Sequence, residues 1–343
     1  MASDFDREKF LKSMQTAVRE KNRAAQLGRH LAEKGLQRIF FVGCGAPNRE
    51  MSVVMYWVEK FSTQLEVRRY FPAELIKLNP PKLDKDTLVI FGSHSGTTPE
   101  MVQAAKFIKQ YPCSTVGITQ TGDSPLPCEV QNVLLYGKSP DEGYQHGYYS
   151  MFMILVALTA GILKSTDGWD LYDQVMKSLD AFPTVLADVM DDSEKRVTDE
   201  ARIYKDDRLI YLAASGPMFC TAYVFGVCVL MEMQWMHTYP VEASEWFHGP
   251  FEIVDQYTPI ILLLGEDDSR PIAERVVRFC KKYTERLIIF DSKNYEMQGI
   301  TKDARSIFAP FVLQAALDRF AEHLAVWHNH PLITRRYMWK TEY

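Results

Sequence analysis

The chain has 343 residues, of which 47% are hydrophobic and 24% are charged, and its formal net charge is -5. These values are typical of a water-soluble globular protein with one large or two ordinary domains. The chain has no dense block of Lys and Arg, which argues against nucleic acid as a partner. Its six cysteines form no CxxC pair, which argues against a zinc site or a disulfide framework and favours the cytoplasm.

Two stretches bear on membrane targeting. The first residues, MASDFDREKFLKSM, mix both charges and lack the apolar core of a secretory signal. The most apolar stretch, residues 148–163, is shorter than the about 20 residues that a bilayer requires. We therefore expect no membrane partner. The apolar stretch predicts a helix buried on all sides, and we expect it at a subunit interface of a homodimer or higher homo-oligomer.

Short apolar stretches alternate with helical patterns along the chain. This alternation is typical of parallel sheets that are covered by helices on both faces. A first series of predicted strands covers residues 38–43, 66–71, 87–92, 114–119 and 133–137. A second series covers residues 209–215, 259–265 and 286–291.

The two series form an internal repeat. Residues 39–47, IFFVGCGAP, share the pattern of residues 210–218, LIYLAASGP, and TLVIFGSHSGTTPE matches TPIILLLGEDDSRPIAE. The sequence therefore predicts an α/β protein with two tandem three-layer αβα halves, each with a mainly parallel sheet. The predicted divisions are a helical extension at 1–35, a first half at 36–165, a helical linker at 166–206, a second half at 207–329 and a tail at 330–343.

The stretch FGSHSGTTPE at 91–100 joins a predicted strand to a predicted helix. Backbone N–H groups at a helix start, short hydroxyls and glycines together form a favourable site for phosphate. Gly92 and Gly96 permit the tight turn, Thr98 is expected to cap the helix, and Pro99 suits its first position. The loop hydroxyls belong to Ser93, Ser95 and Thr98. A simple capped turn uses the same residue types, but three hydroxyls within six residues favour an anion site.

Two further turns give weaker signals. GCGAPN at 43–48 resembles a dinucleotide fingerprint, but Asn48 replaces its third glycine. Gly43 and Gly45 are therefore interpreted as a close-approach turn that lines the same cleft. GEDDSR at 265–270, the counterpart of the hydroxyl-rich loop, is acidic and would repel an anion. Phosphate binding is expected in the first half alone.

Residues 231–255 gather ionisable side chains within an otherwise apolar half. Glu232 lies in an almost wholly apolar helical stretch, where a carboxylate is either paired or functional. His248 precedes a Gly-Pro pair at the expected start of the next helix, where an imidazole is exposed. Such a pair can serve as base and acid, although salt-bridged glutamates and structural histidines are more common. The competing glutamates are Glu242, Glu245 and Glu252.

SHSGTT resembles the phosphate loop of the sugar isomerase (SIS) domain. The tandem repeat resembles the double-SIS arrangement in the isomerase part of glucosamine-6-phosphate synthase. The resemblance implies that the loop hydroxyls hold a sugar 6-phosphate, and His94 and Gly96 are counted with them as substrate-binding candidates. It also implies that the family's base and ring-opening histidine, sixteen positions apart, correspond to Glu232 and His248. One departure is Pro47, where the synthase-like pattern has a serine.

The segment WFHGPFEI and the ending HPLITRRYMWKTEY resemble a narrower group of relatives. These are the amino-sugar deglycases that act on 6-phosphofructose-aspartate or fructoselysine 6-phosphate, and the similarity extends along nearly the whole chain. In the synthase the tail closes over the sugar and carries a Schiff-base lysine. The resemblance assigns that place to Lys340 and implies a tail that closes the active site. A frayed or merely packed tail is the alternative.

The resemblance implies hydrolysis of a 6-phosphorylated sugar–amino acid adduct to a hexose 6-phosphate and a free amino acid. Remote binding of the phosphate would align the reacting end, and no metal or redox cofactor is implied. Three alternatives stay open: a deglycase whose substrate carries nitrogen on C2 and which releases fructose 6-phosphate, an amino-sugar-phosphate isomerase or deaminase, and a non-catalytic sugar-phosphate sensor. The first about 35 residues are too few for the DNA-binding domain that such sensors carry.

Overall fold

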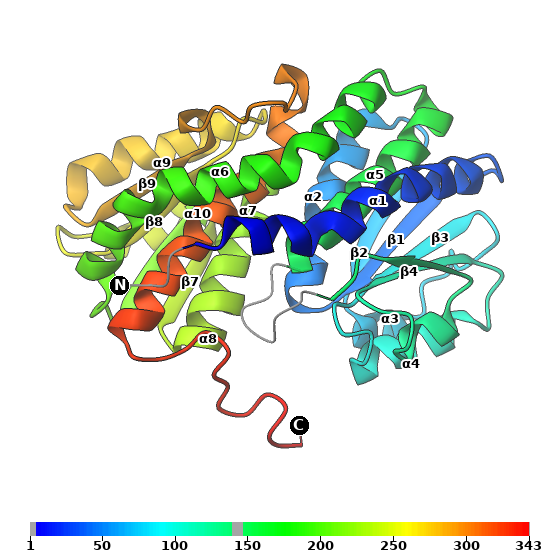
Figure 1. Cartoon of the computed structure of the whole chain (residues 1–343), viewed down its shortest axis with the longest axis horizontal. Coiled ribbons are helices and arrows are strands. Elements are labelled where there is room, and N and C mark those ends of the chain that lie inside the picture. The colour runs from blue at the N-terminus through cyan, green and yellow to red at the C-terminus, as the bar shows by residue number, and fades with distance from the viewer. Residues whose placement is uncertain (1–4, 139–146, 343) are drawn as a thin grey trace. The chain divides into compact units, whose positions relative to one another are not determined.

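The computed structural model describes residues 5–138 and 147–342 and divides the chain into two compact units (Figure 1). The first unit comprises Glu8–Pro183 and Gly299–Ala304. The second unit comprises Met1–Arg7, Thr184–Gln298 and Arg305–Tyr343. The finer division into an extension, two halves, a linker and a tail stays a prediction.

In the first unit, the described residues form a five-stranded parallel sheet with the order β2-β1-β3-β4-β5. The strands are β1 (Arg38–Gly43), β2 (Glu66–Tyr70), β3 (Thr87–Gly92), β4 (Ser114–Thr119) and β5 (Asn132–Leu135). The helices are α1 (Arg7–Ala32), α2 (Gly45–Phe61), α3 (Pro72–Leu78), α4 (Pro99–Ile108), α5 (Gly147–Asp167) and the beginning of α6 (Tyr172–Tyr204). β1 and β3 are buried along their full length, as expected for central strands covered on both faces.

In the second unit, the described residues form a four-stranded parallel sheet with the order β7-β6-β8-β9. The strands are β6 (Leu209–Ala214), β7 (His237–Glu242), β8 (Ile260–Leu264) and β9 (Leu287–Asp291). The helices are the rest of α6, α7 (Phe219–Tyr223), α8 (Glu232–Gln234), α9 (Arg270–Tyr283) and α10 (Arg305–Trp327). This order repeats that of the first four strands in the other sheet, which confirms the predicted tandem α/β organisation.

The predicted strands agree with the observed ones to within two residues at each end. The exception is β7, which the sequence did not predict because a proline and several polar residues interrupt its apolar pattern. Pro240 is tolerated because β7 lies at the edge of its sheet and pairs only with β6 among the described strands.

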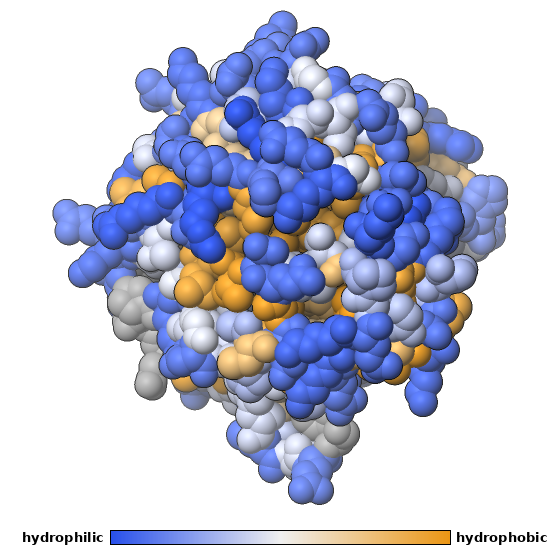
Figure 2. All heavy atoms as spheres, turned by 90° about the vertical axis from the view of Figure 1, so that its right-hand side faces the viewer, coloured by the Kyte–Doolittle hydropathy of each residue, from blue (hydrophilic) through white to orange (hydrophobic). Residues whose placement is uncertain are grey.

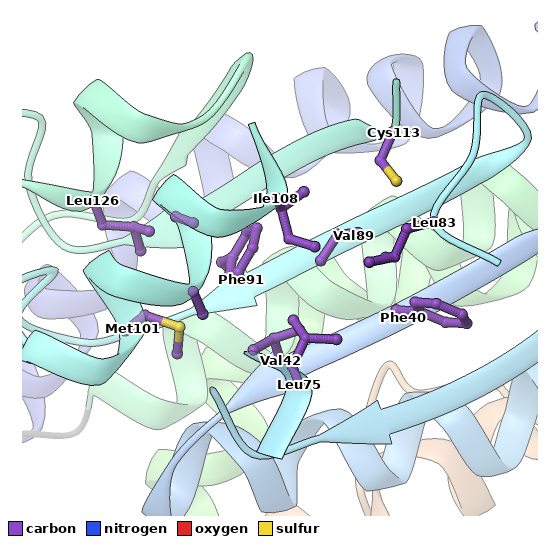
Figure 3. Packing of buried hydrophobic residues seen from close by; sticks show 12 residues of the cluster. Phe40, Val42, Leu75, Leu83, Val89, Phe91, Met101, Ile108, Cys113 and Leu126 are labelled. Carbon is purple, nitrogen blue, oxygen red and sulfur yellow. The ribbon is translucent and has the colours of Figure 1, made fainter. Parts of the chain in front are cut away.

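A buried apolar cluster holds α3 and α4 against one face of the first sheet (Figure 3). Alternate residues of β1 and β3 enter it, because neighbouring side chains of a strand point to opposite faces. Its labelled members are Phe40, Val42, Leu75, Leu83, Val89, Phe91, Met101, Ile108, Cys113 and Leu126. Burial of one such phenylalanine contributes about 1.5–3 kcal/mol. The cluster thereby fixes the start of α4 beside the end of β3.

The opposite face of the first sheet is covered by α2 and α5. A Cβ added to Gly92 would lie 2.1 Å from the methyl carbon of Met151 in α5 and 2.5 Å from that of Met51 in α2. Helix α1 packs on α5 at close backbone distance, because Gly28 and Gly161 leave no side chain between the two helices. These contacts form the outer layers of a three-layer unit.

The apolar helix α5 is longer than predicted. It has 21 residues, and α5 and the stretch Gly216–Gln234 are both long and apolar enough to cross a membrane by length and composition. In α5, however, 83% of the most apolar window is buried inside the chain, and in the second stretch 56%. The expectation that α5 marks a subunit interface is therefore wrong, because one chain already covers it. On the face shown in Figure 2, polar and charged side chains surround a smaller apolar area.

Candidate active site

The hydroxyl-rich loop follows β3 and lies beside the turn that follows β1. Gly43 and Gly92 are direct partners in the parallel register of these two strands. The order β2-β1-β3 places the reversal of strand order between β1 and β3. Ligands of open α/β sheets bind outside the carboxyl ends of the strands at such a reversal. The predicted glycine turn, with Gly43 and Gly45, and the loop of residues 93–98 therefore meet at the favoured edge of the sheet.

The loop is closed by its own hydroxyl groups. Ser93 is buried, and its Oγ accepts a hydrogen bond from the N–H of Gly96 at 3.1 Å. The same Oγ lies 3.4 Å from Oγ1 of Thr98. Ser95 is exposed, and its Oγ accepts hydrogen bonds from the N–H and the hydroxyl of Thr97 at 3.2 and 2.9 Å. The predicted hydroxyls of Ser93 and Thr98 are thus brought together, whereas that of Ser95 faces solvent.

Gly96 has a conformation that favours glycine. Its φ is +66°, and an added Cβ would lie 2.1 Å from Oγ of Ser124 and 2.9 Å from Oγ1 of Thr119. Helix α4 begins at Pro99, as predicted, so its first free N–H groups lie next to the loop. Thr98 occupies the N-cap position, but its side chain makes no capping hydrogen bond. The expected capping role is therefore wrong, because this hydroxyl is directed toward Ser93.

Asn48 fixes the turn after β1. Its side-chain amide donates to the carbonyl oxygen of Gly43 at 2.9 Å and to that of Tyr70 at 3.3 Å. Gly45 begins α2 with a φ of +58°. The residue in place of a third glycine is thus a structural tie between two strand ends, which agrees with the interpretation of a close-approach turn.

His94 lies between two buried side chains that were not among the predicted site residues. Its Nδ1 is 2.5 Å from the hydroxyl of Tyr136, which follows β5, and its Nε2 is 3.5 Å from Oε1 of Glu50 in α2. Burial raises the pKa of Glu50, an effect that His94 partly offsets. Burial also raises the pKa of Tyr136, and the Glu50 carboxylate adds to this effect. Tyr136 therefore keeps its proton.

The second unit places Glu232 at the end of an unusual helix. A π-helical segment, Val224–Met231, leads directly into α8, which Glu232 begins. Such segments occur frequently at functional sites. The hydroxyl of buried Thr238 in β7 donates to the carbonyl oxygen of Gly226 at 3.0 Å. This bond ties the π-helical segment to the neighbouring strand.

Glu232 forms an ion pair with Arg335 of the C-terminal tail. Nη2 of Arg335 lies 2.9 Å from Oε1 of Glu232, and the side chains are 9% and 27% exposed, respectively. Burial raises the pKa of Glu232, and Arg335 counteracts this shift. Arg335 was not predicted as a site residue, although its place in a charged and aromatic tail was a signal. Of the competing glutamates, Glu245 and Glu252 are exposed.

The tail packs against the end of the helix that carries Glu232. The guanidinium carbon of Arg336 lies 4.2 Å from the ring centre of Trp235. The ring of His330 contacts the same indole edge-on, with 4.3 Å between the two ring centres. The side-chain amide of Gln234 donates to the carbonyl oxygen of His330 at 2.8 Å. Lys340 is exposed, and its Nζ donates to the carbonyl oxygen of Arg335 at 2.5 Å. Lys340 thus contacts the residue that pairs with Glu232.

His248 ends a short 3-10 turn that is anchored by the fully buried Trp246. Gly249 follows with a φ of 143°, and a further 3-10 turn begins at Pro250. The imidazole is exposed, as predicted. Within the described part of the chain, no hydrogen bond or ion pair joins it to Glu232 or to any other side chain. The structure therefore does not bring these two predicted residues into contact.

The acidic loop of the second unit is occupied by its own carboxylate. Oδ1 of the buried Asp267 accepts hydrogen bonds from the N–H and the hydroxyl of Ser269 at 2.9 and 2.5 Å. The same hydroxyl oxygen of Ser269 lies 3.0 Å from Oγ of Ser215, the residue that follows β6. A phosphate would have to displace this carboxylate. The contact between Asp267 and Ser269 supports the prediction that only the first half binds phosphate.

The chain is similar to one protein family and to several known proteins in sequence and structure. Residues 30–163 match the SIS domain family. The chain is 35% identical to fructosamine deglycase FrlB of Bacillus subtilis, over 96% of this chain and 100% of that protein. It is 25% identical to fructoselysine 6-phosphate deglycase of Escherichia coli, over 90% of this chain and 87% of that protein. A solved structure from Bacillus subtilis, named as a phosphosugar isomerase, is similar with a TM-score of 0.89 and 35% identity. The similarity covers 96% of this chain and 100% of that chain. The chain belongs to the SIS-domain family.

Proposed function

We propose that this protein is a deglycase that hydrolyses a 6-phosphorylated fructosamine to glucose 6-phosphate and a free amino acid. The full-length similarity to fructosamine deglycase FrlB, at 35% identity, supports this substrate class. In the structure, the observation that carries the proposal is the half-buried carboxylate of Glu232 paired with Arg335. A carboxylate that is partly desolvated and held by one cation suits a residue that must take up and return a proton.

The phosphate of the substrate is assigned to the loop of residues 93–98. The hydroxyls of Ser93, Ser95 and Thr98, the N–H groups at the start of α4 and the turn at Gly43 and Gly45 are the donors and close-approach points for it. The phosphate is chemically remote from the reacting carbons of the substrate, so its binding energy can align the other end of the sugar. This role stays a prediction for each of these residues.

The chemistry moves one proton between two carbons. After ring opening, in which His248 moves the proton of the ring oxygen, the carbonyl is at C2 and the amine is on C1. Glu232 removes a proton from C1 while the C2 oxygen takes up a proton from water, and an enaminol forms. Glu232 then returns its proton to C2, which leaves an iminium at C1. Water adds to C1, and the C1–N bond breaks to release the amino acid and glucose 6-phosphate.

Lys340 is assigned a role in holding the tail rather than in covalent catalysis. The substrate already contains an amine, so the reaction does not require a Schiff base with a lysine. The bond from Lys340 to the carbonyl oxygen of Arg335 supports this assignment. We place the reaction in the cytoplasm. We also infer a homodimer or higher homo-oligomer, because the exposed imidazole of His248 is available to complete a site in another subunit; sedimentation velocity of active protein tests this.

An adduct panel tests the function. Purified protein is incubated with the 6-phosphofructosyl and the 6-phosphoglucosyl adducts of lysine and aspartate, and glucose 6-phosphate and fructose 6-phosphate are assayed separately. Release of glucose 6-phosphate from a fructosyl adduct is the expected result. Release of fructose 6-phosphate from a glucosyl adduct would show that the substrate carries its nitrogen on C2. Binding of hexose 6-phosphate without cleavage of any adduct by folded protein would refute the deglycase.

A further inference from the structure

A buried carboxylate behind the phosphate loop has no role in the proposed chemistry. Glu50 has an exposed fraction of 0%, and none of the described residues forms a well-aligned hydrogen bond to either carboxylate oxygen. Nε2 of His94 lies 3.5 Å from Oε1 of Glu50. Burying an unpaired carboxylate costs several kcal/mol, about 3–5 kcal/mol when a partner is removed. The imidazole of His94 faces this carboxyl group and offsets part of the cost of its burial.

The imidazole of His94 is oriented from two sides. Tyr136 keeps its proton, so its hydroxyl can donate to Nδ1 of a neutral ring, and the ring proton then lies on Nε2, which faces Glu50. A doubly protonated ring also presents an N–H toward Glu50. In both forms the ring lies between the phenol on its Nδ1 side and the carboxyl group on its Nε2 side. The His94 side chain is 28% exposed, so the ring lies at the boundary between the core and the loop surface.

The backbone of the same residue is held as well. The carbonyl oxygen of His94 accepts hydrogen bonds from the N–H of Gln120 and the hydroxyl of Thr119, both at 3.2 Å. These two residues end β4 or follow it, whereas Glu50 lies in α2 and Tyr136 follows β5. Residue 94 is thereby tied to three different elements of the first unit. Ser93 and Ser95, the proposed phosphate ligands, are its direct neighbours in the chain.

We propose that Glu50 is a positioning residue for phosphate binding, which acts with Tyr136 by fixing His94 and through it the geometry of the loop. The inference rests on the proposed function, because the loop is the assumed phosphate site. Glu50 itself touches no substrate: it is fully buried, and its effect passes through the imidazole. Its loss is expected to weaken phosphate binding and to leave the chemical step nearly intact.

Three variants separate charge from shape. Glu50→Leu removes all polar atoms at similar volume, Glu50→Gln keeps one acceptor oxygen for Nε2, and Tyr136→Phe removes only the hydroxyl. Glu200→Gln is the matched control. Glu200 is a half-buried glutamate of the second unit whose pKa is also raised by burial, and one of its oxygens also lacks a partner among described residues. It pairs with Arg196 and belongs to neither candidate site.

Two measurements are made on each folded variant: the dissociation constant of glucose 6-phosphate by titration calorimetry, and kcat and KM for 6-phosphofructosyl-lysine. Glu50→Leu is expected to weaken glucose 6-phosphate binding at least about tenfold, the equivalent of one lost hydrogen bond to a charged group. KM should rise in parallel while kcat changes less than about threefold. Glu50→Gln should recover part of the affinity, and Glu200→Gln should match the wild type.

Wild-type affinity in Glu50→Leu, or an equal loss of kcat and affinity, overturns the positioning role. If Glu50→Leu does not fold, Glu50→Gln and Tyr136→Phe decide, because each removes one contact of the imidazole at nearly constant volume. Absence of glucose 6-phosphate binding by the wild type overturns the phosphate site and this inference together. The wild type could also bind glucose 6-phosphate, with an affinity that falls in Glu50→Leu, and yet cleave no adduct. That result refutes the deglycase alone and supports the positioning role.

Discussion

Arg335→Gln is expected to move the acidic limb of the pH–rate profile to higher pH. Burial raises the pKa of Glu232, and Arg335 at 2.9 Å opposes that shift. Removal of the cation therefore raises the pKa further, and because a general base must be ionised, activity at low pH falls. A hydrogen bond to a charged group is worth about 1.5–3 kcal/mol, and one pKa unit corresponds to about 1.4 kcal/mol, which gives a shift of about one to two pH units.

The lower end of this range is expected, because Glu232 is 27% exposed and water replaces part of the lost contact. The assay is kcat/KM for 6-phosphofructosyl-lysine measured from about pH 5 to about pH 9. Arg336→Gln is the matched control. Its guanidinium lies over the ring of Trp235, and no contact between Arg336 and Glu232 is recorded. The control should keep the acidic limb of the wild type.

The variant also loses bonds that hold the tail. Nη1 of Arg335 donates to the carbonyl oxygens of Leu332 and Thr334 at 2.7 and 3.0 Å. A looser tail would change KM and the height of the plateau, whereas the position of the limb reports the ionisation of the base. An acidic limb at the same pH in Arg335→Gln and in the wild type would refute the reasoning, whatever happens to the plateau.

Three further outcomes test single residues. Glu232→Gln should lower kcat by about 10²–10⁴-fold while calorimetric affinity for glucose 6-phosphate is retained; lost affinity at unchanged kcat would make this residue structural. Ser95→Ala should raise KM about five- to thirtyfold, the value of about 1–2 kcal/mol, and an unchanged KM removes it from the phosphate site. Gly96→Ala should lower the free energy of unfolding by about 1–3 kcal/mol, because a φ of +66° is strained for alanine and its Cβ would collide with Ser124. Urea denaturation measures this loss, and equal urea midpoints for the variant and the wild type would show that the loop relaxes without cost.

The fold could be predicted from the sequence because its signals are local. β1 and β3 are continuous apolar runs that end in glycine, and these runs set the strand bounds almost to the residue. The loop of residues 93–98 was recognisable for the same reason, since glycine, hydroxyl residues and proline stand next to one another in the chain. The edge strand β7 was missed because its sequence combines a proline with polar residues, a pattern that resembles a loop.

The support of the site could not be predicted, because it depends on contacts between distant residues. Glu50, His94 and Tyr136 meet only when α2, β3 and β5 are assembled. Helical spacing from Val54 and Trp57 would have placed Glu50 on the buried face of α2, but not its partner. The hydroxyl of Thr98 shows the same limit, since side-chain direction decides between capping α4 and facing the loop interior.

The π-helical segment before Glu232 lets the chain absorb a change of one residue at this place. A π-helix bonds each N–H to the carbonyl five residues back and so accommodates a residue that an α-helix would not. Removal of one codon within residues 224–231 would let the ladder return to α geometry and leave Glu232 near its present direction, whereas removal of one codon from an ordinary α-helix turns every residue beyond it by about 100°. Single-codon deletions in residues 224–231 should therefore be tolerated better than single-codon deletions in α10, and relatives should differ in length by one residue within this helix.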